Sequence, residues 1–190
     1  GRHAAASSGG RIAKGGLVPI RSLLVSNVLQ LLRDISWPSC TTRNNVRPSG
    51  TDSILAFPLG LVSHFHGLSC STFTRRHAQL CLQLNSFMRA AAPAFRYTTI
   101  QLNNGYSSKL HVDANNEGPS MIIALGNFTG GQLWVYDDDG SVDVKTTERL
   151  RGWPCEVGTV LPGRNVDIHN KLFKFDGNQP HMAHEFAGER

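Results

Sequence analysis

The 190 residues are 40% hydrophobic with a formal net charge of +5, which suits one globular domain with a sizeable core. No stretch reaches the roughly 20 apolar residues of a membrane-spanning helix, which excludes that class of protein. The four cysteines show no regular spacing, so we expect free thiols in an intracellular, reducing compartment, nuclear or cytoplasmic, rather than a disulfide framework.

The first half of the chain predicts helices. Residues 1–16 are rich in Gly, Ala, Ser and Arg, and we expect a disordered basic leader there. One helix is expected from Pro19 to the Trp37-Pro38 step and a second from about 74 to 92, where Pro93 ends it. Apolar residues at helical spacing define the inward faces: Ile20, Leu24, Val28, Leu31 and Ile35, then Leu80, Leu84, Phe87 and Ala91. We therefore assign residues 17–94 to a helical N-terminal support region.

From Tyr97 onward, short strands alternate with turn residues. The expected strands are TTIQLN, KLHVD, SMIIALG, GQLWVYD, VDVKT, GTVL and KLFKF. Residues 121–125 are apolar at every position, which is typical of a strand covered on both faces. Helices followed by many strands predict an α+β fold, with the N-terminal helices packed on the outside of a β-sandwich or jelly roll.

Two segments carry candidate metal ligands. His111 and Asp113 stand two positions apart in HVD, so on a strand both side chains reach one ion. The segment FDGNQPHMAHEFAGER then supplies His181, with Arg190 nine residues later. Two histidines and one carboxylate leave open positions opposite, as non-haem iron(II) requires. Arg190 offers a permanently charged planar fork for the far carboxylate of a dicarboxylic acid.

Together these motifs resemble the double-stranded β-helix (jelly-roll) core of the iron(II)/2-oxoglutarate-dependent dioxygenase superfamily, over residues 95–190. The matching pieces are HVD at 111–113, TGGQLWV at 129–135, and FDGNQPH with the trailing GER at 175–190. The Gly-Gly-x-Leu pattern is similar to prolyl-hydroxylase-like members, and LHVDANNEGPSMIIALGNFTGGQLWV resembles the TET/JBP-like branch, which oxidises thymine or methylcytosine. Residues 1–70 match no pattern of this kind.

The resemblance implies an enzyme that uses 2-oxoglutarate and dioxygen to hydroxylate a C–H bond. His111, Asp113 and His181 are then the metal ligands and catalytic centre, and Arg190 binds 2-oxoglutarate. Because the family's last strand continues past its arginine, we expect that strand to be truncated at Arg190. We also expect metal binding to persist and 2-oxoglutarate binding to be weak in this chain.

Residues before the HVD motif are candidates for the co-substrate pocket. Tyr97, Thr99 and Gln101 alternate along the first core strand, which places them to line the 2-oxoglutarate pocket. Tyr106 and Lys109 are candidates for contact with co-substrate or substrate. Packing or a solvated strand face is the alternative interpretation for all five.

Residues after the HVD motif can likewise be interpreted either as ligand-binding or as structural. Asn115 and Asn116 either contact substrate or form an Asx turn. Trp134 is expected in the core rather than stacked on a ligand.

Other histidines compete for the third ligand position. His184 would point to the opposite face of a strand from His181, and His169 precedes the strand, so His181 is favoured. His64 and His66 form a further HFH pair, which we interpret as structural.

A cupin-like site is the main alternative. Gly105, His111, Asp113 and Glu117 resemble a first cupin motif in which Asp replaces the second His, so that Glu117 becomes a ligand. A second cupin motif does not follow, and Arg190 has no role in such a site. The alternative function is therefore a non-catalytic, cupin-like metal- or ligand-binding jelly roll, with Glu117 otherwise placed in a turn over the site.

The charge is divided unevenly along the chain. Residues 1–110 hold 12 Lys and Arg against 2 Asp, a charge of +10, whereas residues 111–190 hold 7 against 12 Asp and Glu, a charge of −5. A basic half attracts polyanions, which slightly favours a nucleic-acid base as substrate over a protein side chain. No nucleic-acid-binding motif adds support. The first residues to test are Arg75, Arg76, Arg89 and Arg96.

Overall fold

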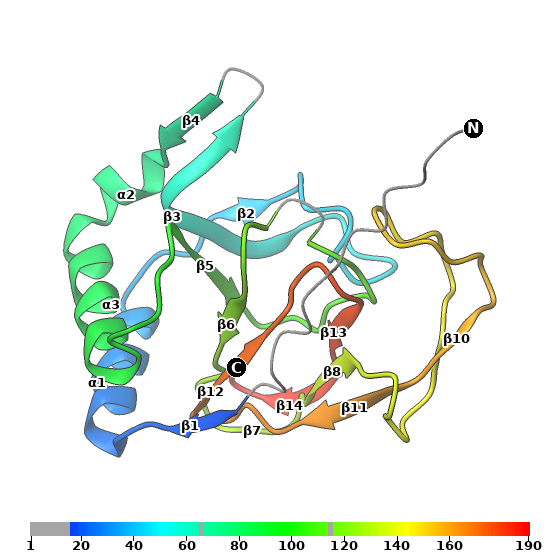
Figure 1. Ribbon diagram of the computed structural model, residues 1–190. Coiled ribbons are helices and arrows are strands. Elements are labelled where there is room, and N and C mark those ends of the chain that lie inside the picture. The colour runs from blue at the N-terminus through cyan, green and yellow to red at the C-terminus, as the bar shows by residue number, and fades with distance from the viewer. Residues whose placement is uncertain (1–15, 65–66, 114–115) are drawn as a thin grey trace, which may run out of the picture.

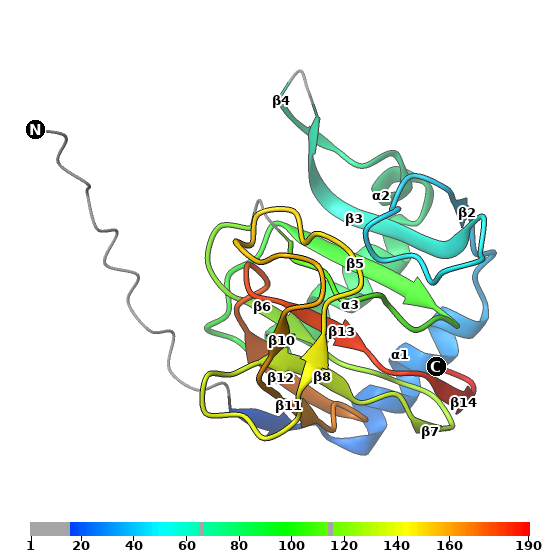
Figure 2. The same ribbon diagram turned by 90° about the vertical axis from the view of Figure 1, so that its right-hand side faces the viewer.

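A computed structural model of the protein describes residues 16–64, 67–113 and 116–190. The expected leader therefore lies outside the described residues except for Gly16. Helices gather on one side of the molecule and most of the C-terminal strands on the other (Figure 1). Figure 2 shows the same arrangement turned by 90°.

The two expected helices are present, and the second is broken into two. α1 (Ser22–Arg33) follows a short strand, β1 (Leu17–Pro19), while α2 (Thr72–Arg76) and α3 (Ala78–Ala91) replace the single helix expected over 74–92. His77 separates them because its backbone, at φ −121° and ψ 44°, lies outside the helical region. Ser71 caps α2 by accepting a hydrogen bond from the Phe73 amide at 3.2 Å.

The region 17–94, expected to be a helical support region, contains strands as well as helices. Residues 39–70 form β2 (Ser39–Cys40), β3 (Ile54–His64) and β4 (Gly67–Cys70). Pro58 and Gly60 lie inside β3 and interrupt any period-two pattern there. β3 is nevertheless a strand because it pairs with β5 over residues 55–60 and with β4 over residues 61–64. These pairings are long-range, and the local sequence does not reveal them.

The C-terminal half is made of short strands. In chain order they are β5 (Thr99–Asn104), β6 (Ser120–Ile122), β7 (Phe128–Gly130), β8 (Leu133–Tyr136), β9 (Val144–Lys145), β10 (Val160–Leu161), β11 (Gly163–Val166), β12 (Lys171–Phe175), β13 (His181–Ala183) and β14 (Phe186–Gly188). β5 and β12 match the expected strands closely, whereas the expected strand over 109–113 is reduced to a single bridge at His111. β7 and β11 were not expected.

The strands pair into small antiparallel sheets, which together with the helices confirms an α+β fold. The segment 120–130 pairs with β12 through β6 and with β14 through β7, and the Gly105 amide donates to the Arg190 carbonyl at 2.9 Å where β5 ends. We call β5, β6, β7, β12 and β14 the first strand set. The second strand set is β11-β8-β13, extended by the His111–His181 bridge. Within the described residues these strands form no closed barrel.

The segment that follows β6 is covered on both faces, as expected. Ile123 and Leu125 pack against a core of α1, α3, β3 and β5 side chains that includes Leu84. Ala124 instead packs in a second core, where side chains of the two strand sets meet, and Val135 lies in this same core. The helices therefore cover the face of this segment that is turned away from the second strand set.

The inward face of α3 can be tested by mutation. Leu84→Ala is expected to lower the free energy of unfolding by about 2–5 kcal/mol, because it leaves a cavity in a packed core. Urea unfolding of the variant measures this loss. Leu82→Ala removes the same atoms from a side chain that is 58% exposed in the same helix, and should cost far less. Equal losses in the two variants would contradict the assigned face.

Two expectations about chain class can be compared with the structure. Cys40, Cys70, Cys81 and Cys155 are all free thiols, as expected. In the part of the chain that the structure describes, none of the helices combines the length and the apolar character needed to cross a bilayer.

Candidate metal centre

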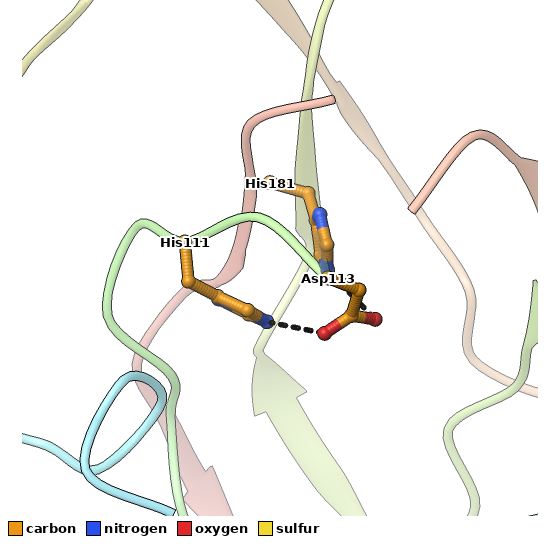
Figure 3. Close-up of side chains that lie close together, drawn as sticks. All are labelled: His111, Asp113 and His181. Atoms are coloured by element: carbon orange, nitrogen blue, oxygen red, sulfur yellow. Dashed lines mark ion pairs between the residues drawn. The ribbon is translucent and has the colours of Figure 1, made fainter. Parts of the chain in front are cut away.

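The three predicted ligands converge although 70 residues separate the two histidines. His111 and His181 form an antiparallel bridge in which each amide donates to the other's carbonyl at 3.0 Å. Residues paired in this way present their side chains on the same face. Asp113 is held one step further along, because its amide donates to the Gly177 carbonyl at 2.8 Å. Figure 3 shows both imidazoles directed at the Asp113 carboxylate.

The ligand atoms lie at distances that one metal ion can bridge after small adjustments. The His111 Nε2 atom lies 3.9 Å from Asp113 Oδ1, and the His181 Nε2 atom lies 3.9 Å from Asp113 Oδ2. All three ligand atoms lie within 4.8 Å of one another. With bonds of about 2.0–2.2 Å, ligands in neighbouring octahedral positions are about 3.0 Å apart. Side-chain rotations that shorten each of the two histidine–aspartate distances by about 1 Å bring these pairs to that spacing.

Backbone carbonyls fix the tautomer of both histidines. The Nδ1 atom of His111 lies 2.7 Å from the Lys109 carbonyl oxygen, and the Nδ1 atom of His181 lies 2.8 Å from the Gln179 carbonyl oxygen. Because a carbonyl oxygen only accepts, each Nδ1 carries the proton, and each Nε2 keeps a free lone pair turned toward Asp113. This orientation by a second partner is typical of metal-binding histidines.

Three acceptor groups converge at one point. Two Nε2 atoms without a proton and a carboxylate face one another, and the side-chain donor that reaches them within the described residues is Asn116 Nδ2, 3.4 Å from Asp113 Oδ2. Both histidines are buried, at 8% and 5% exposure, while the Asp113 side chain is 33% exposed. Buried acceptors facing one another are unfavourable unless a proton or a metal ion lies between them. The donor set therefore fits a divalent metal, and Asp113 leaves it an open side.

Burial keeps both imidazoles neutral near pH 7. Burial, the largest cause, and the neighbouring His181 together lower the pKa of His111 to about 4. Burial also lowers the pKa of His181. Because only a neutral imidazole binds a metal, no proton has to leave either ring before metal binding at pH 7.

The metal-free protein is expected to lose stability between pH 6.5 and about 4. In this window an unfolded histidine, with a pKa near 6.5, binds more protons than folded His111 with its pKa of about 4. The stabilising contribution is complete above pH 6.5 and is lost as the pH falls. Urea midpoints across this range measure it, and His111→Gln should flatten the slope while His184→Gln should not. A slope unchanged in His111→Gln would contradict the assignment.

Among the described residues, His169, His184 and Glu117 lie outside this group. His169 contacts the Gly126 carbonyl oxygen through Nε2 at 2.9 Å, and His184 contacts Asn165 Oδ1 at 2.7 Å. Glu117 is exposed and is absent from the group of potential ligands that the described residues form. Among the described residues, the structure thus groups His181, rather than His169 or His184, with His111 and Asp113. Metal binding by these three residues stays a prediction.

Some predicted residues cannot be placed. Asn115 and His66 lie outside the described residues, as does the side chain of His64. Asn116 is described, and its Nδ2 donates to Ser120 Oγ at 3.0 Å and lies 3.4 Å from Asp113 Oδ2. It is thus a neighbour of the triad rather than part of it. Trp134 is fully buried and donates to the Val142 carbonyl at 2.8 Å, as expected of a core residue.

Tyr97, Thr99 and Gln101 were predicted to line the co-substrate pocket, and their contacts lie elsewhere. The Tyr97 hydroxyl donates to Asn85 Oδ1 of α3 at 2.8 Å, and Thr99 donates to the Leu61 carbonyl on β3. Gln101 is exposed and donates to the Leu102 carbonyl at 2.9 Å. Among the described contacts, none joins these three side chains to the triad. Their role toward 2-oxoglutarate stays a prediction.

Arg190 is well placed to bind an anion. Its guanidinium lies 5.7 Å from the ring centre of Phe128 and 5.3 Å from that of Phe186. Its Nε atom is buried without a hydrogen-bond partner, and within the described residues Arg190 forms no ion pair. Burial lowers the pKa of this guanidinium, which nevertheless stays charged. A half-buried guanidinium without an ion pair among the described residues is a candidate carboxylate site.

The four arginines proposed for nucleic acid are exposed on α2, on α3 and just after α3. The triad, by contrast, belongs to the second strand set, since His181 pairs with Val135 of β8. The helices and β13 lie on different sides of the molecule in Figure 1. A ligand bound along these helices would therefore not reach the triad directly.

Sequence reasoning missed Arg43, which lies in the loop before β3 and contacts Tyr106 at 3.3 Å. No motif singled it out, because only the fold brings the loop against the HVD segment.

Comparisons with protein-family models, with curated proteins and with solved structures give no significant match. Function therefore has to be inferred from the site itself.

Proposed function

We propose that the protein is an iron(II)- and 2-oxoglutarate-dependent dioxygenase with His111, Asp113 and His181 as its metal ligands. The observation that carries the proposal is the convergence of two neutral histidines and one carboxylate. Backbone carbonyls hold both imidazoles so that their Nε2 atoms point toward the carboxylate. A facial set of two histidines and one carboxylate is typical of non-haem iron(II) oxygenases. The resemblance of HVD and FDGNQPH to that superfamily gives the same assignment.

The order in which the chain enters the two strand sets supports a jelly-roll fold for this core. With the sets as defined above, the chain runs through β5 in the first set and the His111 segment in the second. It then passes through β6 and β7 in the first set, and β8 and β11 in the second. β12, β13 and β14 then alternate between first, second and first. Such alternation between two facing sheets is typical of jelly rolls. We infer a double-stranded β-helix that lacks full closure.

In the proposed dioxygenase, the triad, Arg190 and Phe175 have different roles. The two histidines and Asp113 hold the metal from one side, and the one-third exposed carboxylate leaves the other side open for ligands. Iron, when bound there, supplies the activation of dioxygen that is coupled to decarboxylation of 2-oxoglutarate. Arg190 binds the far carboxylate of 2-oxoglutarate and so orients it. The Phe175 ring packs at a steep angle against the His181 imidazole, with 5.0 Å between the two ring centres.

We propose that the C–H bond to be oxidised belongs to a nucleic-acid base. A C–H bond of a protein side chain is the alternative. The charge asymmetry of the two halves supports the first choice. To reach the triad, a base would have to be turned out of its stack. The exposed arginines of α2 and α3 do not adjoin the triad, so they would hold another part of the nucleic acid.

The proposal is tested by adding iron(II) and 2-oxoglutarate to the protein and measuring succinate by mass spectrometry, with oligonucleotides and peptides as candidate substrates. Iron-dependent succinate is the expected result. Metal binding without succinate under any of these conditions would favour the non-catalytic, cupin-like function instead. Absence of metal binding would overturn both.

A further inference from the structure

A cluster rich in hydrogen-bond donors lies at the end of β5. The Asn103 Oδ1 atom accepts from Tyr106 Oη at 2.7 Å, from Arg43 Nη1 at 3.0 Å and from Gln101 Nε2 at 3.4 Å. An amide oxygen has two lone pairs, so three donors compete for two places. Arg43 Nη1 also donates to Tyr106 Oη at 3.3 Å. The cluster therefore has more donors than acceptors, the reverse of the triad.

The charge of Arg43 is not matched by an acid. Within the described part of the chain, Arg43 forms no ion pair, and its hydrogen bonds all start from Nη1. By contrast, Arg33 is paired with Glu189 and Arg164 with Asp137. A guanidinium has five N–H donors in a planar fork, so most of the Arg43 fork is left for a ligand.

The loop that carries Arg43 adjoins the triad. The Val46 carbonyl accepts from the Lys109 amide at 3.1 Å, which ties this loop to the segment immediately before His111. Tyr106 also lines a cavity of about 250 Å³, together with Pro48 and other residues. The loop that carries Arg43 is thus hydrogen-bonded to the segment that carries His111, and space for a small group exists beside Tyr106, the partner of Arg43.

We propose that Arg43, assisted by Tyr106, binds an oxyanion group, a carboxylate or a phosphate, on the molecule that is oxidised at the triad. The proposal rests on the proposed function, and it gives Arg43 a task separate from that of Arg190. The N–H groups that remain free on the Arg43 fork meet the need of an oxyanion for paired donors. The Tyr106 hydroxyl accepts from Arg43 Nη1 at 3.3 Å and so holds the fork in place. The substrate class is accordingly an anionic one: a nucleotide unit if phosphate binds, or an acidic side chain or small acid if carboxylate binds.

The test follows the Arg43 Nε–Hε signal by NMR in the full ¹⁵N-labelled chain, metal-free and zinc-loaded, at pH 7. Sodium acetate and sodium phosphate are the probes, with sodium chloride at equal ionic strength as the control. We expect a saturable shift with at least one probe, at millimolar concentration, and none with chloride. The probe that binds identifies the source of the oxyanion. Shifts equal to those with chloride for both probes would overturn the proposal.

Variants make the assignment specific. Arg43→Lys keeps the charge without the fork and should weaken probe binding about tenfold, measured on the Tyr106 ring signals. Arg43→Gln should abolish it, while Arg151→Gln, which removes an exposed arginine outside this cluster, should not change it. Circular dichroism checks that each variant is folded. If Arg43→Gln does not fold, Arg43→Lys still tests the proposal. Unchanged binding in Arg43→Lys and in a folded Arg43→Gln would contradict the proposal.

A last comparison separates this subsite from the co-substrate site. Arg43→Gln and Arg43→Lys should leave the affinity for 2-oxoglutarate of the iron-loaded protein within about twofold of wild type. A loss in either variant as large as in Arg190→Gln would assign Arg43 to the co-substrate and overturn the proposal. The acetate and phosphate titrations of the metal-free protein measure anion binding at Arg43 without any metal. A failure of metal binding can therefore be told apart from a failure of anion binding.

Discussion

Asp113→Ala is expected to abolish iron binding at physiological metal concentrations, and with it all succinate formation. The carboxylate is the only anionic member of the group, and it faces both Nε2 atoms at 3.9 Å. Without it, two neutral imidazoles remain. A loss of iron affinity of at least about 100-fold is expected, because mutation of a residue that only hydrogen-bonds to a metal ligand already costs about 10–100-fold. Anaerobic titration with iron(II), and with cobalt(II) for its absorption spectrum, measures the loss.

The fold should survive this change. Asp113 is partly exposed, so its truncation creates no core cavity, and metal-free Asp113→Ala should melt within a few degrees of wild type. Asp143→Ala, which removes an exposed carboxylate outside the candidate group, is the matched control and should bind iron normally. Wild-type iron affinity in Asp113→Ala would refute the triad.

Arg190→Gln is expected to weaken 2-oxoglutarate binding to the iron-loaded protein by about 100-fold while leaving iron binding intact. Two charge-assisted hydrogen bonds to a carboxylate contribute about 3 kcal/mol together, which corresponds to a factor of about 100. The buried, unpartnered Nε atom is the structural reason to expect that this guanidinium is reserved for a ligand. Anaerobic calorimetric titration with 2-oxoglutarate measures the change.

The effect should depend on the far carboxylate of the co-substrate. 2-Oxobutyrate keeps the metal-chelating end of 2-oxoglutarate but lacks that carboxylate, so its weaker binding should be the same in wild type and Arg190→Gln. Arg96→Gln removes an exposed arginine after α3 and serves as the charge control. An equal affinity for 2-oxoglutarate in wild type and Arg190→Gln would show that Arg190 is not the anchor.

Several features follow from the sequence alone because they depend on neighbours along the chain. Apolar spacing predicted α1 and the inward face of α3, where Leu80, Leu84 and Phe87 are buried. The HVD spacing and the Pro-His context selected His111, Asp113 and His181, which the fold brings together. Local periodicity and motif spacing are sufficient for such predictions, since they require no knowledge of which distant segment is adjacent.

Other features were decided only by the tertiary structure. The pairing of β3 with β5 makes a strand of a segment that contains Pro58 and Gly60. The His111–His181 bridge and two backbone carbonyls set the histidine tautomers, and the contact of the Val46 loop with the HVD segment brings Arg43 beside Tyr106. These are pairings between residues far apart in sequence, whose stability comes from burial and backbone hydrogen bonds across strands. Short-range preferences of about 1 kcal/mol do not encode them.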